Sequence, residues 1–231
     1  MRVYVDLHLH SCLSPCGDAL MTPNNIAGMS MLKQLDVIAV ADHNSARNLP
    51  AVAEACRVVG VGLLPAMELT TAEEVHLLAY FPDVDSACAF SQEIYPFLPA
   101  VDNRPALFGP QQVMNDQDEE IASEPRLLIS ALNLTIDELV NRIHARGGAA
   151  VPAHINRGSN GLLNALGFLP PDLPVDALET TRGMPCAANL SGRRLLHSSD
   201  AHDLGNISER DFFLELEEAT PEAVFRWIRG L

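Results

Sequence analysis

Short apolar runs alternate along the chain with longer segments in which apolar residues recur at helical spacing. The runs predict buried strands, and the periodic segments predict helices packed against them. Strands are expected at residues 2–7, 37–41, 63–69, 75–80, 149–153, 175–179, 195–198 and 212–216. Helices are expected at residues 23–33, 49–59 and 136–146 and from Pro221 onward, with glycines closing the second and third.

This order of strands and helices predicts an α/β fold with a mostly parallel sheet and right-handed crossovers. We expect residues 1–231 to form a single domain, and a TIM-like barrel rather than an open sheet. In a barrel the carboxyl ends of all strands converge on one face. Residues 83–135 interrupt the alternation and are interpreted as an insertion, with a hairpin formed by residues 111–114 and 120–122.

Six of the eight histidines lie in short clusters that also contain carboxylates, and each cluster follows or lies within an apolar run. Neutral imidazole and ionised carboxylate are ligands that zinc, manganese and iron accept. The clusters are Asp6-Leu7-His8-Leu9-His10, Asp42-His43-Asn44, Glu68 with His76, Pro152-Ala153-His154, and Ser199-Asp200-Ala201-His202. Because the strand ends of a barrel meet, the pattern predicts one multinuclear metal centre assembled from several loops.

Spacing gives some of these residues a more specific interpretation. His8 and His10 are two residues apart, so on a strand they point to the same face, as two ligands of one ion would. Asp200 and His202 repeat this spacing. Glu68 ends an apolar run, where an ionised carboxylate is costly to bury unless it has a partner, and bridging two metals would provide one.

Other interpretations remain open for several positions. His76 is flanked by apolar residues and is also consistent with a core histidine, and Asp42-His43 is also consistent with a turn before a helix. Asp6 and Asp42 are expected to orient neighbouring histidines. His144, on a predicted helix, and His197, within a predicted strand, are not expected to bind metal.

Composition restricts the environment and the partners of the chain. It has 231 residues, no apolar run as long as a membrane helix needs, and an N-terminal segment that is interpreted as a strand rather than a signal peptide. Five cysteines without zinc-finger spacing indicate reduced thiols and a cytoplasmic location. The formal net charge of -15 repels nucleic-acid polymers. We therefore expect a small phosphorylated substrate, no membrane contact and no extended nucleic-acid footprint.

With its ordered histidine and carboxylate motifs, the chain resembles the PHP (polymerase and histidinol phosphatase) family. The resemblance implies a distorted barrel of seven parallel strands, (β/α)7, that holds up to three divalent ions, zinc, manganese or iron. It assigns a first ion to His8, His10, Glu68 and Asp200, with Glu68 bridging to a second ion at His76 and His202. A third ion would bind His43, His154 and a residue of the first loop. Asp18 is the best match in that loop, with Cys16 as the alternative.

The resemblance also implies a metal-dependent phosphoesterase acting on a phosphomonoester or a nucleotide phosphodiester. Divalent ions supply a nucleophile by lowering the pKa of water, and Glu68 and Asp200 are the expected catalytic carboxylates. Arg157 and Arg182 are candidates for binding phosphate. A metal-dependent amidohydrolase is the main alternative, although its usual bridging lysine is lacking, since Lys33 lies on a predicted helix. A non-catalytic metal-stabilised module is the second alternative.

Overall fold

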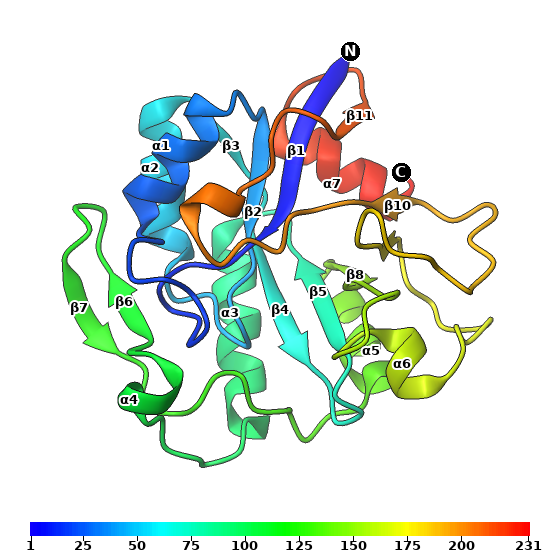
Figure 1. The fold of residues 1–231 in the computed structure, drawn as a ribbon, viewed down its shortest axis with the longest axis horizontal. Coiled ribbons are helices and arrows are strands. Elements are labelled where there is room, and N and C mark those ends of the chain that lie inside the picture. Colours follow the sequence, from blue (N-terminus) through cyan, green and yellow to red (C-terminus); the bar gives the residue numbers. More distant parts are fainter.

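The computed structural model describes all residues 1–231, and its largest sheet has the strand order β11-β1-β2-β3. Strand β1 (Arg2–Leu9) pairs in parallel with β2 (Val37–Val40), and β2 pairs in parallel with β3 (Gly62–Leu63). Strand β11 (Phe213–Glu215) returns from the end of the chain and pairs antiparallel to β1. Figure 1 shows β1 and β2 side by side at the centre of the molecule.

Three smaller sheets complete the strand arrangement. Strands β4 (Ala66–Thr70), β5 (His76–Tyr80) and β8 (Ala149–Pro152) form an antiparallel sheet in that order. Strand β9 (Leu178–Glu179) pairs in parallel with β10 (Leu195–Leu196), and β6 (Gln112–Met114) forms a hairpin with β7 (Glu120–Ser123). Single bridges connect the sheets, from Leu9 to Ala201 and from His43 to Glu68.

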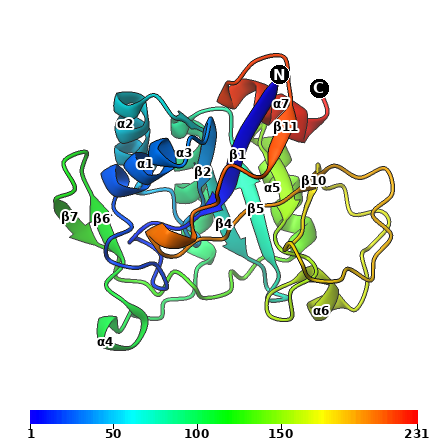
Figure 2. The ribbon, with the colours of Figure 1, turned by 45° about the horizontal axis from the view of Figure 1, so that its top comes forward.

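The helices surround these strands. They are α1 (Pro23–Leu32), α2 (Leu49–Val59), α3 (Val84–Ile94), α4 (Pro105–Phe108), α5 (Ile136–Ala145), α6 (Leu162–Leu166) and α7 (Pro221–Arg229), with 3-10 turns at Tyr95–Phe97 and Leu204–Asn206. Figure 2 shows α1, α2 and α3 on one side of the strands and α5 and α7 on the other. None of the helices is long and apolar enough to cross a membrane.

Local sequence explains where the predicted helices begin and end. Thr135 and Glu138 form a reciprocal capping box at the start of α5. Gly60 ends α2 in a left-handed conformation, with φ of 78°, which glycine adopts without steric cost. These signals account for the agreement between the predicted and observed bounds of both helices.

The mixed α/β class is confirmed, but the predicted closed parallel barrel is not formed. The strands divide into four sheets, and β5 runs antiparallel to both β4 and β8. The reason is the short connection of residues 71–75 between β4 and β5. A parallel crossover needs a dozen or more residues, so this segment forms a hairpin instead. The insertion contains the predicted hairpin and two helices, α3 and α4, which were not predicted.

Strand β5 shows why the strands are apolar without alternation. Leu77 and Ala79 belong to a core cluster of 39 buried residues, whereas Leu78 and Tyr80 belong to a second cluster of 18. Both faces of this strand are therefore buried, as in the centre of a layered α/β protein. The ionisable side chain that β5 adds to the candidate site, His76, lies at the first residue of the strand.

Candidate metal centre

The strand ends bring distant histidines and carboxylates to one edge of the sheets. They are His8 and His10 near the end of β1, His43 after β2, Glu68 within β4, His154 after β8, and Asp200 and His202 after β10. His76 is the first residue of β5 rather than one of its last. Because β5 runs opposite to β4, its beginning lies at this same edge, where His76 pairs with Thr70.

Glu68 lies at the centre of this arrangement and is 1% exposed. Its Oε1 atom lies 2.8 Å from Nδ1 of His76 and 3.3 Å from Nε2 of both His8 and His154. Its Oε2 atom lies 3.2 Å from Nδ1 of His43 and 3.4 Å from Nε2 of His10. The two oxygens thus face different imidazoles, which is the arrangement that a carboxylate bridging two cations requires.

Asp200 provides the second central carboxylate. Its Oδ1 atom lies 3.1 Å from Nε2 of His10 and 3.4 Å from Nε2 of His8. Its other oxygen is paired with the guanidinium of Arg157. Nδ1 of His202 lies 2.8 Å from the backbone carbonyl oxygen of Asp200, so the ring is held within the same loop.

Three sets of ligand atoms lie within 4.8 Å of one another and could each hold a cation. The sets are His8, His10, Glu68 and Asp200; His43, Glu68 and His76; and His10, Cys16, His43 and His202. The first set is the one expected for the first ion. The other two differ from the expected grouping, because His76 lies with His43 rather than with His202, and because His154 approaches Glu68 instead of completing the third set.

The first loop supplies Cys16 rather than Asp18. Asp18 is exposed, and its carboxylate accepts a hydrogen bond of 2.8 Å from the backbone of Leu20. The backbone N–H of Gly17 donates to the carbonyl of Ser14 at 2.9 Å, which closes a tight turn. A side chain at Gly17 would collide with the Ser11 carbonyl. This turn directs Cys16 toward the histidines and Asp18 away from them, so the expectation for Asp18 is corrected.

Unpartnered buried atoms show that the residues suit cations. Both carboxylate oxygens of Glu68 and the Nδ1 atoms of His43, His76 and His154 are buried and make no hydrogen bond. A buried polar group without a partner costs roughly 1–3 kcal/mol, and an unpaired charge costs more. Divalent cations would satisfy these atoms together, because their ligands are ionised carboxylates and neutral imidazoles.

The electrostatics of the cluster separate its histidines. Burial opposes the charged form of His10, but Asp200 and Glu68 outweigh it and raise its pKa to about 9. Burial lowers the pKa of His43 well below its usual value, and it lowers the pKa of His202 to about 4. Burial alone would raise the pKa of the Glu68 carboxyl. The surrounding imidazoles, above all those of His76 and His8, outweigh burial and hold this pKa well below its usual range. Glu68 is therefore ionised at neutral pH.

Glu179 was not predicted to belong to the site. Its buried Oε2 atom lies 3.1 Å from Nδ1 of His8 and accepts a hydrogen bond of 3.0 Å from the backbone N–H of His154. A carboxylate in this position orients a ligating histidine and fixes its tautomer. A sequence signal was present, because Glu179 ends a predicted strand as Glu68 does, but no histidine stands beside it.

Asp42 also orients a histidine of the cluster, although not the expected one. It accepts hydrogen bonds of 2.7 Å from the backbone of Ser11 and from the hydroxyl of Ser14. The Ser14 oxygen lies 2.9 Å from Nδ1 of His10, so Asp42 positions His10 rather than His43. Because the Ser14 hydroxyl donates its hydrogen to Asp42, its oxygen accepts a hydrogen bond from Nδ1 of His10. Nε2 of His10 is left free and is directed at Glu68 and Asp200.

Asp6 acts on the opposite loop rather than on the first histidine pair. Its carboxylate accepts hydrogen bonds from the backbone N–H groups of Ser199 and Ser208, both at 2.9 Å. This anchors the loop that carries Asp200.

Asp200 and His154 adopt φ values of 54° and 30°, a region that costs about 1–3 kcal/mol for residues other than glycine. Such strain persists only where the surrounding contacts fix the conformation, and here it occurs at two candidate ligands.

The two arginines expected to bind phosphate have different surroundings. Arg157 lines a cavity of about 160 Å³ together with the candidate ligands, and Ile129 is the one residue of the insertion that reaches it. Arg182 does not line this cavity, because its guanidinium pairs with Asp211 at 2.5 Å. The expectation for Arg182 is therefore corrected.

The remaining two histidines lie outside all three sets. Nε2 of His144 is 2.7 Å from a carboxylate oxygen of Asp176, and Nδ1 of His197 is 2.9 Å from the hydroxyl of Thr180. Each thus has a partner of its own away from Glu68.

The fold is similar to that of endonuclease Q from Pyrococcus furiosus, a lesion-specific endonuclease, with a TM-score of 0.69 and 21% sequence identity. The match covers 100% of the present chain and 56% of endonuclease Q. A second endonuclease Q structure contains a 27-mer duplex with an abasic lesion at the active site. It matches with a TM-score of 0.66 and 22% sequence identity, over 100% of the present chain and 57% of endonuclease Q. The chain therefore spans little more than half the length of endonuclease Q.

This similarity corrects the predicted partner. We expected a small phosphorylated substrate and no extended nucleic-acid footprint, but endonuclease Q, which is similar in fold to this chain over 57% of its length, binds a DNA duplex. The expectation was wrong because it used the net charge of the whole chain. Charge is unevenly distributed, since residues 155–171 and 180–199 contain four arginines and no aspartate or glutamate. A local field of this kind is compatible with a phosphate backbone.

Two further solved structures match this chain over nearly their own whole length. A protein from Bifidobacterium adolescentis described as a metal-dependent phosphoesterase matches with a TM-score of 0.62 and 17% identity, over 97% of this chain and 96% of that one. An amidohydrolase from Chromobacterium violaceum with bound sulfate matches with a TM-score of 0.58 and 16% identity, over 99% of this chain and 96% of the amidohydrolase. No protein-family model and no curated protein sequence matches the chain. The chain thus has the mixed α/β fold that is found in endonuclease Q, in this phosphoesterase and in this amidohydrolase.

Proposed function

We propose that the protein is a PHP-type, metal-dependent phosphoesterase that hydrolyses phosphodiester bonds in a nucleic acid. One observation carries the proposal, namely the buried Glu68 carboxylate, whose two oxygens lie within 3.4 Å of nitrogens from five histidines. Asp200 adds a second carboxylate to the same cluster. A buried set of this composition is typical of a centre for two or more divalent cations.

Each proposed metal position uses one of the three sets of atoms. The first ion would bind His8, His10, Glu68 and Asp200, and the second would bind His43, Glu68 and His76. His10, Cys16, His43 and His202 form the third set. Because only Nε2 of His10 is free, this residue would bind a cation either there or in the first set. When bound, divalent cations polarise phosphoryl oxygens and make water nucleophilic at neutral pH. Zinc, manganese and iron all accept nitrogen and oxygen ligands.

The protein's own groups prepare the site for a phosphodiester. Arg157 places a permanent positive charge at the cavity and would bind a non-bridging phosphoryl oxygen through charge-assisted hydrogen bonds. Asp200 holds this guanidinium in place. Glu179 and Ser14 fix the rings of His8 and His10 through their Nδ1 atoms, so that both Nε2 atoms point into the cluster. The geometry is thus set before a substrate binds.

A nucleic acid is the proposed substrate because endonuclease Q combines this fold with a DNA duplex. Arg157, which lines the cavity, and Arg193, which forms no ion pair with a carboxylate, support the same choice. The present chain matches just over half of endonuclease Q, so lesion specificity is not carried over with the fold.

The structure provides an argument against an amidohydrolase. Lys33, the single lysine of the chain, follows α1 and pairs with Glu209 at 3.0 Å. It does not line the cavity and is not available to bridge two cations there. Glu68 occupies the central position instead.

The proposal is tested with bis(p-nitrophenyl) phosphate and a labelled oligonucleotide, using protein loaded with manganese or zinc. We expect hydrolysis of both, loss of activity with a chelator, and more than one metal per chain by elemental analysis. Glu68→Gln should abolish hydrolysis and metal binding, whereas Glu218→Gln, at an exposed position, should affect neither. Hydrolysis of an amide substrate without hydrolysis of either ester would reject the proposal.

A further inference from the structure

Three cavities adjoin one another through shared lining residues, in a succession that leads away from the candidate metal centre. The cavity that contains Glu68 shares Arg157 with a second cavity of about 230 Å³. The second cavity shares Leu163 and Ala187 with a third, of about 530 Å³. We call the second and third cavities together the α6 groove, because Leu163 belongs to helix α6. A volume of this size is enough for a nucleotide-sized ligand.

The groove has two walls that are fixed to each other. One wall consists of residues 155–171, and the other of residues 180–199. Asn156 connects them, since its side-chain amide donates to the carbonyls of Thr181 and Met184 at 3.0 Å and accepts from the N–H of Thr181 at 2.8 Å. The groove is therefore a built feature and not a gap between independent loops.

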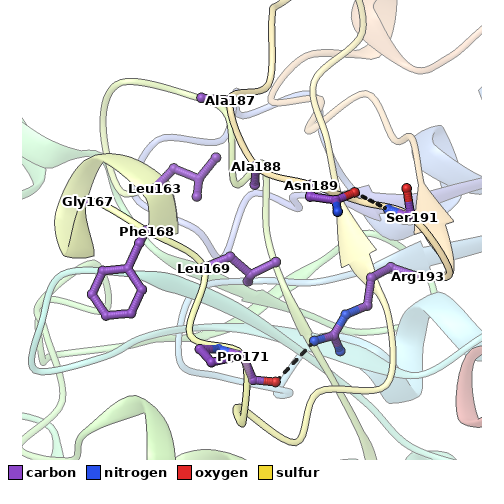
Figure 3. Close-up of a pocket in the computed structure, with 10 residues that line it drawn as sticks. All are labelled: Leu163, Gly167, Phe168, Leu169, Pro171, Ala187, Ala188, Asn189, Ser191 and Arg193. Carbon is purple, nitrogen blue, oxygen red and sulfur yellow. Dashed lines mark hydrogen bonds between the residues drawn. The ribbon is translucent and has the colours of Figure 1, made fainter.

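Both walls are free of negative charge in a chain that is otherwise acidic. Of the residues that line the groove, Arg157 and Arg193 are charged and none is an aspartate or glutamate, although the whole chain has a net charge of -15. No carboxylate forms an ion pair with Arg193, whose guanidinium makes a long contact of 3.5 Å with the carbonyl of Pro171 (Figure 3). This arginine thus keeps its charge available to an anionic ligand.

An aromatic side chain lies on the other side of the largest cavity. Phe168 is 59% exposed, and Figure 3 shows it across from Arg193, with Leu169 between them. A positively charged groove that also presents an exposed aromatic ring is the usual architecture for single-stranded nucleic acid. In sites of this kind the ring stacks on a base, and arginines bind the phosphates.

We propose that the α6 groove binds the nucleotides next to the scissile phosphate of a polynucleotide strand. Phe168 would stack on a base, and Arg193 would bind a backbone phosphate. Arg157 lies where the groove meets the metal centre, so the strand would continue from the groove to the candidate cations. This inference rests on the proposed function and identifies where its substrate lies.

The experiment measures binding of a short fluorescent oligonucleotide with phosphorothioate linkages to the metal-loaded protein, as single-stranded DNA and as single-stranded RNA. Phe168→Ala should weaken binding about five-fold or more. Arg193→Gln should reduce the slope of log affinity against log salt by about 0.7, the loss of one phosphate contact with a single strand. Either nucleic acid satisfies the inference, and the two arms identify which one is preferred.

Two matched substitutions outside the groove serve as controls. Leu32→Ala removes an apolar side chain that is 71% exposed, and Arg57→Gln removes an exposed arginine of α2. We expect both variants to bind like the wild type. Equal losses in these variants, unchanged affinity in the groove variants, or equal competition by poly-glutamate would overturn the inference.

Hydrolysis of bis(p-nitrophenyl) phosphate separates this inference from the proposed function. The small diester reaches the metal centre without filling the groove, so the ratio of kcat/KM for the oligonucleotide to that for the small diester should fall in both groove variants. A wild-type protein that hydrolyses neither compound contradicts the proposed function. A wild-type protein that hydrolyses both, with a ratio unaffected by the groove variants, contradicts the groove alone.

Discussion

Glu179 accepts a hydrogen bond from Nδ1 of His8, with the two atoms 3.1 Å apart and both side chains buried. His8 Nε2 faces Glu68 and Asp200, so Glu179 determines which nitrogen of the ring is free to bind a cation. The same carboxylate also holds the backbone of His154 at 3.0 Å. Glu179 thereby positions the proposed ligand His8 and the neighbouring His154 without belonging to any of the three sets.

The first prediction concerns this residue. Glu179→Gln should lower the affinity for manganese or zinc about 10- to 100-fold, because the ring of His8 loses its charged partner. Titration with a competing chelator measures the affinity, and circular dichroism verifies that the fold is retained. Glu218→Gln is the matched control. An unchanged affinity in a folded Glu179→Gln protein would show that the hydrogen bond has no role in metal binding.

The second prediction distinguishes Cys16 from Asp18. The cobalt-loaded protein should show a thiolate-to-cobalt absorption band in the near ultraviolet, because Cys16 lies with three histidines. Cys16→Ser should remove the band, while Asp18→Asn and Cys88→Ser should retain it. A band that persists in Cys16→Ser, or that disappears in Asp18→Asn, would place the loop ligand elsewhere.

The third prediction is a pH dependence of metal binding. The pKa of His10 is raised to about 9, so this ring binds a proton at neutral pH that a cation has to displace. The proton contributes stability to the metal-free fold that is complete below about pH 6.5 and is lost as the pH rises through about 9. Metal affinity changes in the opposite direction and should rise up to about tenfold per pH unit between these values.

Calorimetry in two buffers with different ionisation enthalpies measures this effect, because a proton released on binding adds the heat of buffer protonation. His144→Gln is the control, since this ring pairs with Asp176 outside the cluster. Metal binding that releases no proton at pH 7 would contradict the assignment of His10 as a ligand that is protonated before the metal binds.

The fourth prediction compares the two arginines. Arg157→Gln should lower kcat/KM for bis(p-nitrophenyl) phosphate about ten- to a hundred-fold while the metal content stays the same, because one charge-assisted contact to the phosphoryl group is lost. Arg182→Gln should leave kcat/KM unchanged, since its partner is Asp211 at the surface. Equal effects of the two substitutions would contradict a specific role of Arg157.

Local patterns in the sequence were sufficient to identify most of the secondary structure and the six clustered histidines. His8 and His10, for example, were placed together by strand periodicity alone, and the structure keeps them on one face with their Nε2 atoms 3.2 Å apart. The start of α5 was predicted correctly for the same reason, because Thr135 is recognised as a cap from its immediate neighbours alone.

Features that depend on distant contacts were not accessible in the same way. Glu179 acquires its role from His8, which is 171 residues away, and no local pattern records that pairing. The position of Cys16 beside three histidines depends on a turn at Gly17, which no local pattern indicates. The predicted barrel failed because the direction of β5 follows from the length of one connection, which periodicity does not report.

The antiparallel course of β5 makes the centre sensitive to a segment that contains none of its ligands. Residues 71–75 set the register that places His76 opposite Thr70. One additional residue in this turn would shift β5 by one position and rotate the imidazole of His76 toward the opposite face of the sheet. Surface turns usually tolerate insertions, but an insertion within these five residues should lower the metal content of the protein, even in a variant that still folds.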